Sequence, residues 1–123
     1  MTDSGGDLDG LRVLNAEIAR AEDRGDVGFF SDLLHDRFAM LRPNGLWEGK
    51  DGFLSRVQAG GTRRSGPCDT QLVGNRAVCL CVVEKVDGDT LDFFSNLRVF
   101  VRSGADEPWR LVCWLNEPMA ATE

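Results

Sequence analysis

"AVCLCVVEKVDGDTLDFFSNLRVFVR", residues 77–102, is the stretch that decides the fold of this chain. Valine, leucine and phenylalanine recur in both halves, and β-branched and aromatic residues favour extended backbone. The Asp-Gly-Asp triplet at 87–89 separates the halves and is typical of a tight turn between paired strands. The stretch therefore predicts a long antiparallel hairpin with strands over 77–86 and 90–102.

A two-residue turn gives this hairpin a register in which paired residue numbers sum to an odd value, so its two faces can be listed. One face is almost wholly apolar, and we expect it to lie under the helices; it carries Val78, Leu80, Val82, Glu84, Leu91, Phe93, Ser95, Leu97, Val99 and Val101. The other face is mixed and carries Ala77, Cys79, Cys81, Val83, Lys85, Asp92, Phe94, Asn96, Arg98, Phe100 and Arg102. An apolar centre with a polar rim is typical of an interface between chains, so the mixed face predicts a homodimer, the alternative being a partly solvated face in a monomer.

The segments around the hairpin predict three helices and two further strands. The helices are indicated by apolar residues at three- and four-residue steps, by Asp26 and Asp51 as N-caps and by Gly25 as a helix end. The expected elements are helices over 8–24, 26–35 and 51–59, strands over 38–42 and 109–117, a turn at 43–45 and a loop over 62–70. This order indicates one α+β domain over residues 7–118, between a disordered N-terminal tail at 1–6 and a C-terminal tail at 119–123.

The composition argues against several classes of function. The 123-residue chain carries a formal charge of −6, and an acidic surface repels phosphate backbones, so we expect no nucleic-acid partner. No segment approaches the roughly 20 apolar residues of a membrane helix, and the start lacks signal-peptide features, so we expect a cytoplasmic protein with no membrane partner. The four cysteines are then expected to be reduced. The spacing of Cys79 and Cys81 suits neither zinc nor a disulfide between them, and we expect no metal and no cofactor.

Three segments carry a resemblance to a known family: AEDRGDVGFFSDLLHDRF at 21–38, LRPNGLWEGKDGF at 41–53 and EPWRLVCWLNE at 107–117. In this order, and over about residues 8–117, they resemble the NTF2-like superfamily, most nearly its SnoaL-like and DUF4440-type bacterial members. The resemblance implies a cone, in which three N-terminal helices pack on a curved antiparallel sheet around an apolar pocket, often with dimerisation through the sheet. Members include isomerases, dehydratases, cyclases, epoxide hydrolases and proteins of no known activity, so the fold does not fix the function.

The ketosteroid-isomerase members allow a comparison residue by residue. The resemblance places Ile18 at their oxyanion-holding tyrosine, Arg42 at their general-base aspartate and Ser95 at their second aspartate. Isoleucine cannot donate a hydrogen bond, arginine stays protonated at neutral pH, and the chain contains no tyrosine. The sequence therefore argues against this isomerase chemistry. Whether the protein catalyses another reaction stays open, with Glu84 and His35 as the conceivable proton carriers, although His35 is expected only to complement a helix dipole.

The remaining candidates fall into two groups. Arg42, with Trp47 nearby, is expected to hold a carboxylate or phosphate at the mouth of the cone through paired hydrogen bonds. The pocket candidates are Arg42, Trp47, Ser95, Met40 and Glu84. The dimer-face candidates are Phe94, Asn96, Arg98, Phe100, Cys79, Cys81 and Trp114. Each pocket residue also has a structural interpretation, such as an ion pair of Arg42 with Glu48, Asp51 or Glu84.

Two hypotheses of function follow. In the first, a homodimeric NTF2-like protein binds a small, mostly apolar molecule, neutral or anionic, in its cone. In the second, a non-enzymatic assembly or regulatory module fills the cone with its own side chains and binds a partner through the sheet. The size of the cavity separates them, because ligand sites run to roughly 300–1,000 Å³ and a pocket below about 100 Å³ would argue against the first.

Overall fold

The predicted hairpin is present in the computed structural model, which describes residues 4–119 of the chain. Strands β5 (Arg76–Asp87) and β6 (Thr90–Val101) pair antiparallel over their whole length, with Asp87 opposite Thr90. The turn consists of Gly88 and Asp89, and Gly88 has a φ of 61°, which a glycine adopts without strain. Every pair sums to an odd number, so the predicted register is confirmed.

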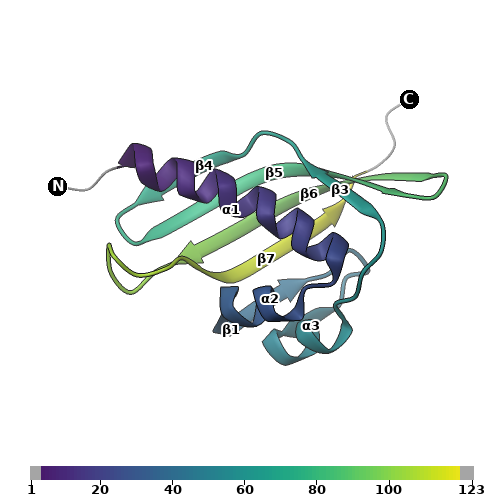
Figure 1. Cartoon of the computed structure of the whole chain (residues 1–123), viewed down its shortest axis with the longest axis horizontal. Coiled ribbons are helices and arrows are strands. Elements are labelled where there is room, and N and C mark those ends of the chain that lie inside the picture. The colour runs from purple at the N-terminus through teal and green to yellow at the C-terminus, as the bar shows by residue number, and fades with distance from the viewer. Residues whose placement is uncertain (1–3, 120–123) are drawn as a thin grey trace.

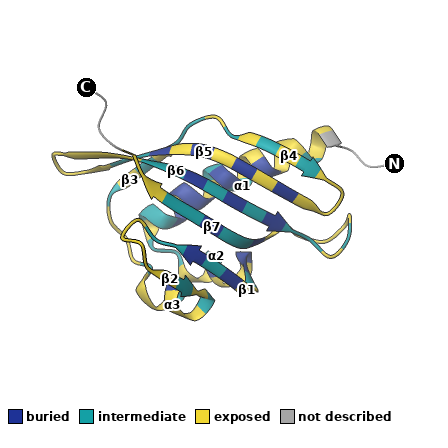
Figure 2. Cartoon of the chain, turned by 180° about the vertical axis from the view of Figure 1, so that it is seen from behind, coloured by how far each residue is buried: buried dark blue, intermediate teal, exposed yellow. Residues whose placement is uncertain are grey.

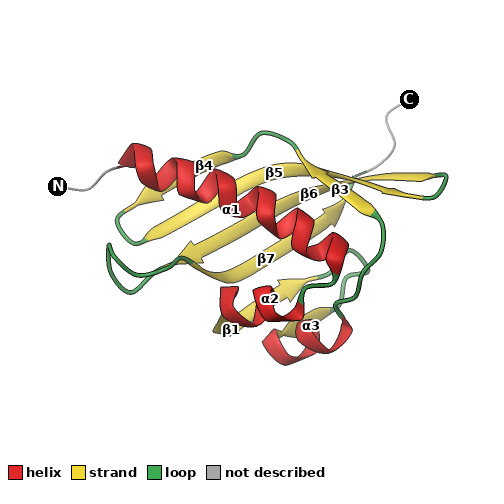
Figure 3. Cartoon of the chain, in the orientation of Figure 1, coloured by secondary structure: helices red, strands yellow, loops and turns green. Residues whose placement is uncertain are grey.

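Five further strands extend the hairpin into a seven-stranded sheet (Figures 1 and 3). On one side, β7 (Arg110–Pro118) pairs antiparallel with β6, β1 (Leu34–Leu41) runs parallel to β7, and β2 (Trp47–Gly49) forms that edge. On the other side, β3 (Thr62–Ser65) and β4 (Asp69–Val73) both pair with β5. The strand order is β2-β1-β7-β6-β5-β3, with β4 beside β5.

Three helices cover one face of this sheet. Helix α1 (Ser4–Arg24) crosses β5, β6 and β7, while α2 (Val27–Leu33) and α3 (Lys50–Arg56) lie by β1 (Figure 1). Gly25 separates α1 from α2 with a φ of 66°, and the Asp26 side chain accepts the backbone N–H of Phe29 at 3.0 Å. Both the glycine helix end and the aspartate cap are as predicted. Within residues 4–119, no helix combines the length and apolar character needed to cross a membrane.

Several predicted boundaries are wrong. His35 lies in β1 rather than at the end of a helix, because this strand begins at Leu34 to pair with β7. Helix α3 ends at Arg56 and has Gly49, not Asp51, at its N-cap position. The loop expected over 62–70 contains β3 and the first two residues of β4. Of the expected N-terminal tail, residues 4–6 are helical, while residues 1–3, like 120–123 of the C-terminal tail, lie outside the described residues.

The assignment of the two hairpin faces is also wrong, because the helices cover the mixed face. Leu80 on the apolar face is 47% exposed, whereas its neighbours Cys79 and Cys81 are 0% and 4% exposed. Figure 2 shows the sheet from the side opposite α1, with exposed positions alternating along β5. The exposed large apolar residues of this outer face are Val78, Leu80, Val82, Val86, Leu91 and Phe93.

This inversion removes the predicted dimer face. Its members Asn96, Arg98, Phe100, Cys79, Cys81 and Trp114 are all buried within one chain, and Phe94 is half-buried. The small side chains of Ala77 and Cys79 allow the helices to approach the sheet closely. The polar side chains of this face, Asn96, Arg98 and Trp114, hydrogen-bond to one another. A mixed composition here reflects a buried polar network, not an interface with a second chain.

Candidate functional site

A buried polar network forms the floor of the space between α1 and the sheet. The Arg98 guanidinium donates from Nη1 to Asn15 Oδ1 at 2.8 Å and from Nη2 to Asn96 Oδ1 at 3.0 Å. Asn96 Oδ1 also accepts the indole N–H of Trp114 at 2.7 Å, and Asn96 Nδ2 donates to Asn116 Oδ1 at 3.0 Å. These bonds hold the two amides of Asn96 and Asn116 in fixed orientations.

Arg98 is a fully buried cation without a carboxylate bonded to it. Its side chain is 0% exposed, and its guanidinium carbon lies 4.6 Å from the centre of the Trp114 ring. Its Nε has no hydrogen-bond partner within the described part of the chain. The charge of Arg98 acts on the Glu22 carboxylate and on the Cys81 thiol, and a buried cation that is hydrogen-bonded to neutral amides favours negatively charged groups nearby.

A cavity of about 170 Å³ opens above Asn96 and Asn116, at the end of the sheet where α1 ends. Its apolar wall consists of Met40, Val83 and Phe94. The complete lining is Glu22, Met40, Arg42, Pro43, Arg56, Arg63, Val83, Lys85, Phe94, Asn96 and Asn116. Four of these side chains are cationic and one is acidic, although the chain as a whole carries a formal charge of −6. Positive charge is therefore concentrated at this cavity.

Two of the four cations are held by surrounding carboxylates. Arg56 Nε donates to both oxygens of Glu48, at 2.7 and 2.8 Å, and the Glu48 side chain is only 10% exposed. Arg63 Nη1 donates to Asp23 Oδ1 at 3.0 Å, and the backbone N–H of Arg63 donates to the same carboxylate. These bonds fix the positions of both guanidinium groups and use part of their charge.

The other two cations are less neutralised. Arg42 Nε lies 3.9 Å from Glu48 Oε1, at the limit of an ion pair, and Glu48 is already engaged by Arg56. Lys85 makes no ion pair with any residue between 4 and 119. In the sheet register it lies between Arg63 on β3 and Asp92 on β6, so one cross-strand neighbour carries a like charge and the other an opposite charge. Arg42 and Lys85 are thus the cations most available to a bound anion.

Glu22 is the acidic residue of the cavity wall. Its carboxylate lies 3.5 Å from Arg63 Nε and the side chain is 16% exposed. Burial raises the pKa of Glu22, although the positive charges of Arg63 and Arg98 oppose that rise. Since a raised pKa favours the neutral form, Glu22 repels an anion less than an exposed glutamate would.

The cavity continues into an outer space of about 470 Å³ that shares Glu22, Arg42, Arg56, Arg63 and Lys85 with it. The 57–60 segment, between α3 and β3, forms part of the wall of this outer space. Molecules can therefore approach the four cations from solvent.

The predicted pocket residues divide into two groups. Arg42 and Met40 line the cavity, and the predicted ion pair of Arg42 with Glu48 is also present, at 3.9 Å. Trp47 is 62% exposed on the edge strand β2 and does not line it. Ser95 and Glu84 belong to the outer face, because the faces are inverted.

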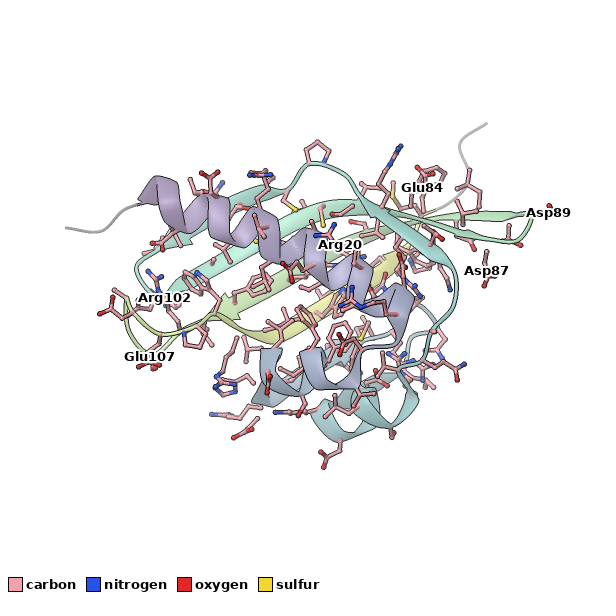
Figure 4. The ribbon with its side chains drawn as sticks, viewed as in Figure 1. Arg20, Glu84, Asp87, Asp89, Arg102 and Glu107 are labelled. Carbon is pink, nitrogen blue, oxygen red and sulfur yellow. The ribbon has the colours of Figure 1, made fainter. Side chains whose placement is uncertain are left out.

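Glu84 pairs with Arg64 at 3.7 Å, on the hairpin arm that carries Asp87 and Asp89 (Figure 4). His35 belongs to a different depression together with Arg102, toward the opposite end of the sheet. Its Nδ1 accepts the backbone N–H of Arg37 at 3.0 Å. Neither proposed proton carrier reaches the cavity.

Sequence reasoning missed Glu22, Arg56, Arg63 and Lys85 as pocket residues. They come from the end of α1, from α3 and from two different strands, and no spacing along the chain relates them. One usable signal was the Asn15 position within the apolar stripe of the first helix, since a buried asparagine requires polar partners on the covered sheet face.

Comparison with known proteins identifies the fold. No family model and no curated protein matches the chain. Among solved structures, a protein from Exiguobacterium sibiricum assigned as a Ca/calmodulin-dependent kinase II association domain is similar with a TM-score of 0.78, 16% identity and 99% of both chains covered. An NTF2-like protein from Cytophaga hutchinsonii is similar with a TM-score of 0.73 and 18% identity, covering 87% of this chain and 95% of that one.

The fold is NTF2-like. The association domain of Caenorhabditis elegans CaMKII gives the same result, with a TM-score of 0.75 and 14% identity over 94% of this chain and 97% of that one. The predicted α+β cone, with helices packed on a curved antiparallel-rich sheet, is confirmed. At these identities the likeness shows the fold alone. In this NTF2-like chain, the position compared above with the isomerase tyrosine is Ile18, which is fully buried in the core.

Proposed function

We propose that this NTF2-like protein binds a small organic anion, such as a short-chain carboxylate, in the cavity above Asn96 and Asn116. The observation that carries the proposal is the convergence of Arg42, Arg56, Arg63 and Lys85 on one cavity of a chain with net negative charge. Guanidinium groups bind carboxylates through paired hydrogen bonds, so a carboxylate head among these side chains is the favoured occupant.

The shape of the cavity supports a small apolar body behind that head. Met40, Val83 and Phe94 form an apolar wall, and the Asn96 and Asn116 amides form a polar floor. A volume of about 170 Å³ is below the roughly 300–1,000 Å³ of drug-sized ligand sites. The proposed ligand is therefore a few carbons long, with its anionic group toward Arg42 and Lys85.

The test compares butyrate with butyramide, which has the same shape without the charge. Titration calorimetry is expected to show binding of butyrate and none of butyramide. Arg42→Gln should weaken butyrate binding by about 10- to 100-fold, because a hydrogen bond to a charged group contributes roughly 1.5–3 kcal/mol.

Arg64→Gln is the matched control, since it removes the same charge from the outer face, where Arg64 pairs with Glu84. Equal losses in the Arg42 and Arg64 variants, or equal binding of butyrate and butyramide, would contradict the proposal.

A second candidate function is self-assembly through the outer face of the sheet. Leu80, Val82 and Phe93 are 47%, 42% and 42% exposed there, and a contiguous apolar surface of this kind marks an interaction site. We propose that a second copy of this chain covers it, forming a homodimer. The similarity to proteins called association domains supports this choice of occupant.

Two finer assignments also belong to this proposal. The SnoaL-like or DUF4440-type placement rests on the sequence segments at 21–38, 41–53 and 107–117. A cytoplasmic location rests on the character of the sequence and is testable by fractionation of cells that express the protein.

A further inference from the structure

A groove separate from the anion cavity lies between the first half of α1 and the edge strands β3 and β4 (Figure 1). Its volume is about 690 Å³. Its lining residues are Leu8, Asp9, Arg12, Asn15, Ala16, Ser65, Gly66, Pro67, Cys68 and Thr70. Cys68 is half-buried, and its side chain is thus reachable from solvent through this groove.

Cys68 faces a second cysteine across the sheet. In the β4–β5 register, Asp69 pairs with Leu80 and Thr70 with Cys79. The residue before Asp69 therefore lies opposite Cys81. Directly opposed residues of antiparallel strands have Cα atoms roughly 4.5–5.5 Å apart, within the roughly 4.4–6.8 Å that a disulfide requires. Gly66, before Cys68, also lies beside β5, since its backbone N–H donates to Val82 O at 2.8 Å. Both thiols are free, and the Cys68 S–H donates to Gly66 O at 4.0 Å.

The surroundings of the pair favour a thiolate. The interaction with Cys68 lowers the pKa of Cys81, against the opposing effect of burial, and the nearby Arg98 cation lowers it further. The same interaction raises the pKa of Cys68. Loss of one proton from the pair is therefore favoured, and a thiolate is the nucleophilic form of cysteine.

We propose that Cys68 and Cys81 form an oxidation site, at which a hydroperoxide entering the groove converts the two thiols into a cross-strand disulfide. This inference is independent of the anion cavity. It rests on the cross-strand register of β4 and β5, on the Gly66–Val82 hydrogen bond that keeps the chain before Cys68 beside β5, and on the access that the groove gives to Cys68.

The reaction has two balanced steps. First, Cys68, which lines the groove, attacks one peroxide oxygen as a thiolate; an S–O bond forms, the O–O bond breaks, and the released alkoxide or hydroxide takes a proton from water, leaving Cys68 as a sulfenic acid. Second, Cys81 attacks the Cys68 sulfur as a thiolate; the S–S bond forms and the sulfenic oxygen takes a proton and leaves as water. The hydroperoxide is reduced by two electrons and the two thiols are oxidised by two.

The other two cysteines lack this arrangement. Cys79 is fully buried and accepts a hydrogen bond from Thr70 Oγ1 at 3.5 Å, so its cross-strand neighbour is a hydroxyl group. Cys113 pairs with Val99 on β6 and Ala39 on β1. The reaction should therefore be confined to the Cys68–Cys81 pair.

The experiment treats the folded full-length protein with a small molar excess of hydrogen peroxide and maps its thiols by mass spectrometry. The expected product has lost two hydrogens and contains one cross-link, which dithiothreitol reverses. Trypsin leaves Cys79 and Cys81 in one peptide, 77–85, so fragmentation between them, or a Cys79→Ser variant that still cross-links, must assign the bond to Cys81. The rate should rise with pH, because the thiolate is the form of cysteine that attacks the peroxide.

Two variants complete the test. Cys81→Ser should abolish the cross-link and leave a dimedone-reactive sulfenic acid on Cys68, whereas Cys113→Ser should oxidise like the unmodified protein. Cys113 itself should react roughly tenfold more slowly than the pair, since thiolate character and access control cysteine oxidation. A disulfide between any other two cysteines, a cross-link between chains, or loss of Cys113 at the rate of the pair would overturn the proposal. The mapping on the unmodified protein decides the matter even where a variant fails to fold.

Discussion

Leu80→Thr is expected to weaken the proposed dimer without unfolding the chain. Leu80 lies opposite Leu97 on β6, and Leu97 lies opposite Leu115 on β7, so the three side chains form a row across the outer face. At 47% exposed, Leu80 is among the more accessible members of that face. Threonine is β-branched, which strands favour, and it replaces the apolar isobutyl group of leucine with a shorter side chain that carries a hydroxyl group.

The magnitude follows from the exposed fraction. Full burial of a leucine side chain contributes roughly 1.5–3 kcal/mol, and about half of the Leu80 side chain remains to be buried when a partner covers it. Each copy then contributes about 1 kcal/mol to association. A two-fold symmetric interface contains the residue twice, so the loss is about 2 kcal/mol. This corresponds to a dissociation constant about 30-fold higher.

Sedimentation equilibrium over a range of protein concentrations measures this constant directly. Val13→Thr on α1 is the control, because Val13 is equally exposed, at 47%, but lies on the helical side of the sheet. Both variants should unfold at nearly the same urea concentration as the unmodified protein when all are monomeric. A dissociation constant unchanged by Leu80→Thr, or shifted equally by Val13→Thr, would refute the assignment of the outer face.

Three further outcomes are expected. The unmodified protein should bind butanesulfonate, which stays ionised, more tightly as the pH falls through the raised pKa of Glu22 and the carboxylate becomes neutral. Glu22→Gln should make this binding stronger and independent of pH. An unchanged pH profile by calorimetry would argue against Glu22 as a neighbour of the anion. Gly25→Ala should lower the free energy of unfolding in urea by at least about 2 kcal/mol, because the φ of Gly25 is 66° and an added Cβ would lie 2.3 Å from the backbone nitrogen of Ala59. A loss below about 0.5 kcal/mol would contradict this close approach of the 57–60 segment to Gly25. Phe53→Ala should lower the free energy of unfolding by about 3–5 kcal/mol. The Phe53 ring is 2% exposed, and its centre lies 4.9 Å from that of Phe30 and 5.9 Å from that of Trp114. An unchanged unfolding midpoint would place this cluster outside the core.

Local chemistry accounts for the parts of the fold that the sequence predicted correctly. The register of the long hairpin follows from its two-residue turn, and the break between the first two helices follows from Gly25 and Asp26. These features depend on residues adjacent in the chain. The short edge strands β3 and β4 depend instead on pairing with β5, and TRRS at 62–65 has no strand character of its own.

The candidate site was predictable only in part for the same reason. Arg42 and Met40 share a face of one strand that was recognised, so their neighbourhood could be inferred. Lys85 was assigned to a surface that is in fact covered, and Arg63 lies in a strand taken for a loop. The convergence of these cations is a property of the sheet order, which no local pattern determines.

The inverted faces of the hairpin show why hydrophobicity alone cannot orient a sheet. Both faces contain enough apolar surface to be buried, so the difference between them carries little free energy until the partner of each face is specified. In the observed orientation the Arg98 guanidinium is buried, and the free-energy cost of removing its charge from water must be offset by hydrogen bonds and packing inside the protein. Asn15 supplies an acceptor from α1, Asn96 supplies another from the same strand, and the Trp114 ring lies against the guanidinium. The opposite orientation would leave Asn15 without its partner beneath the helix and would bury Glu84, which has no such network. A buried asparagine on the helix therefore determines which face of the sheet is covered. Replacing Asn15 with leucine should destabilise the chain, because Nη1 of Arg98 would lose its acceptor, and urea unfolding of Asn15→Leu would measure the loss.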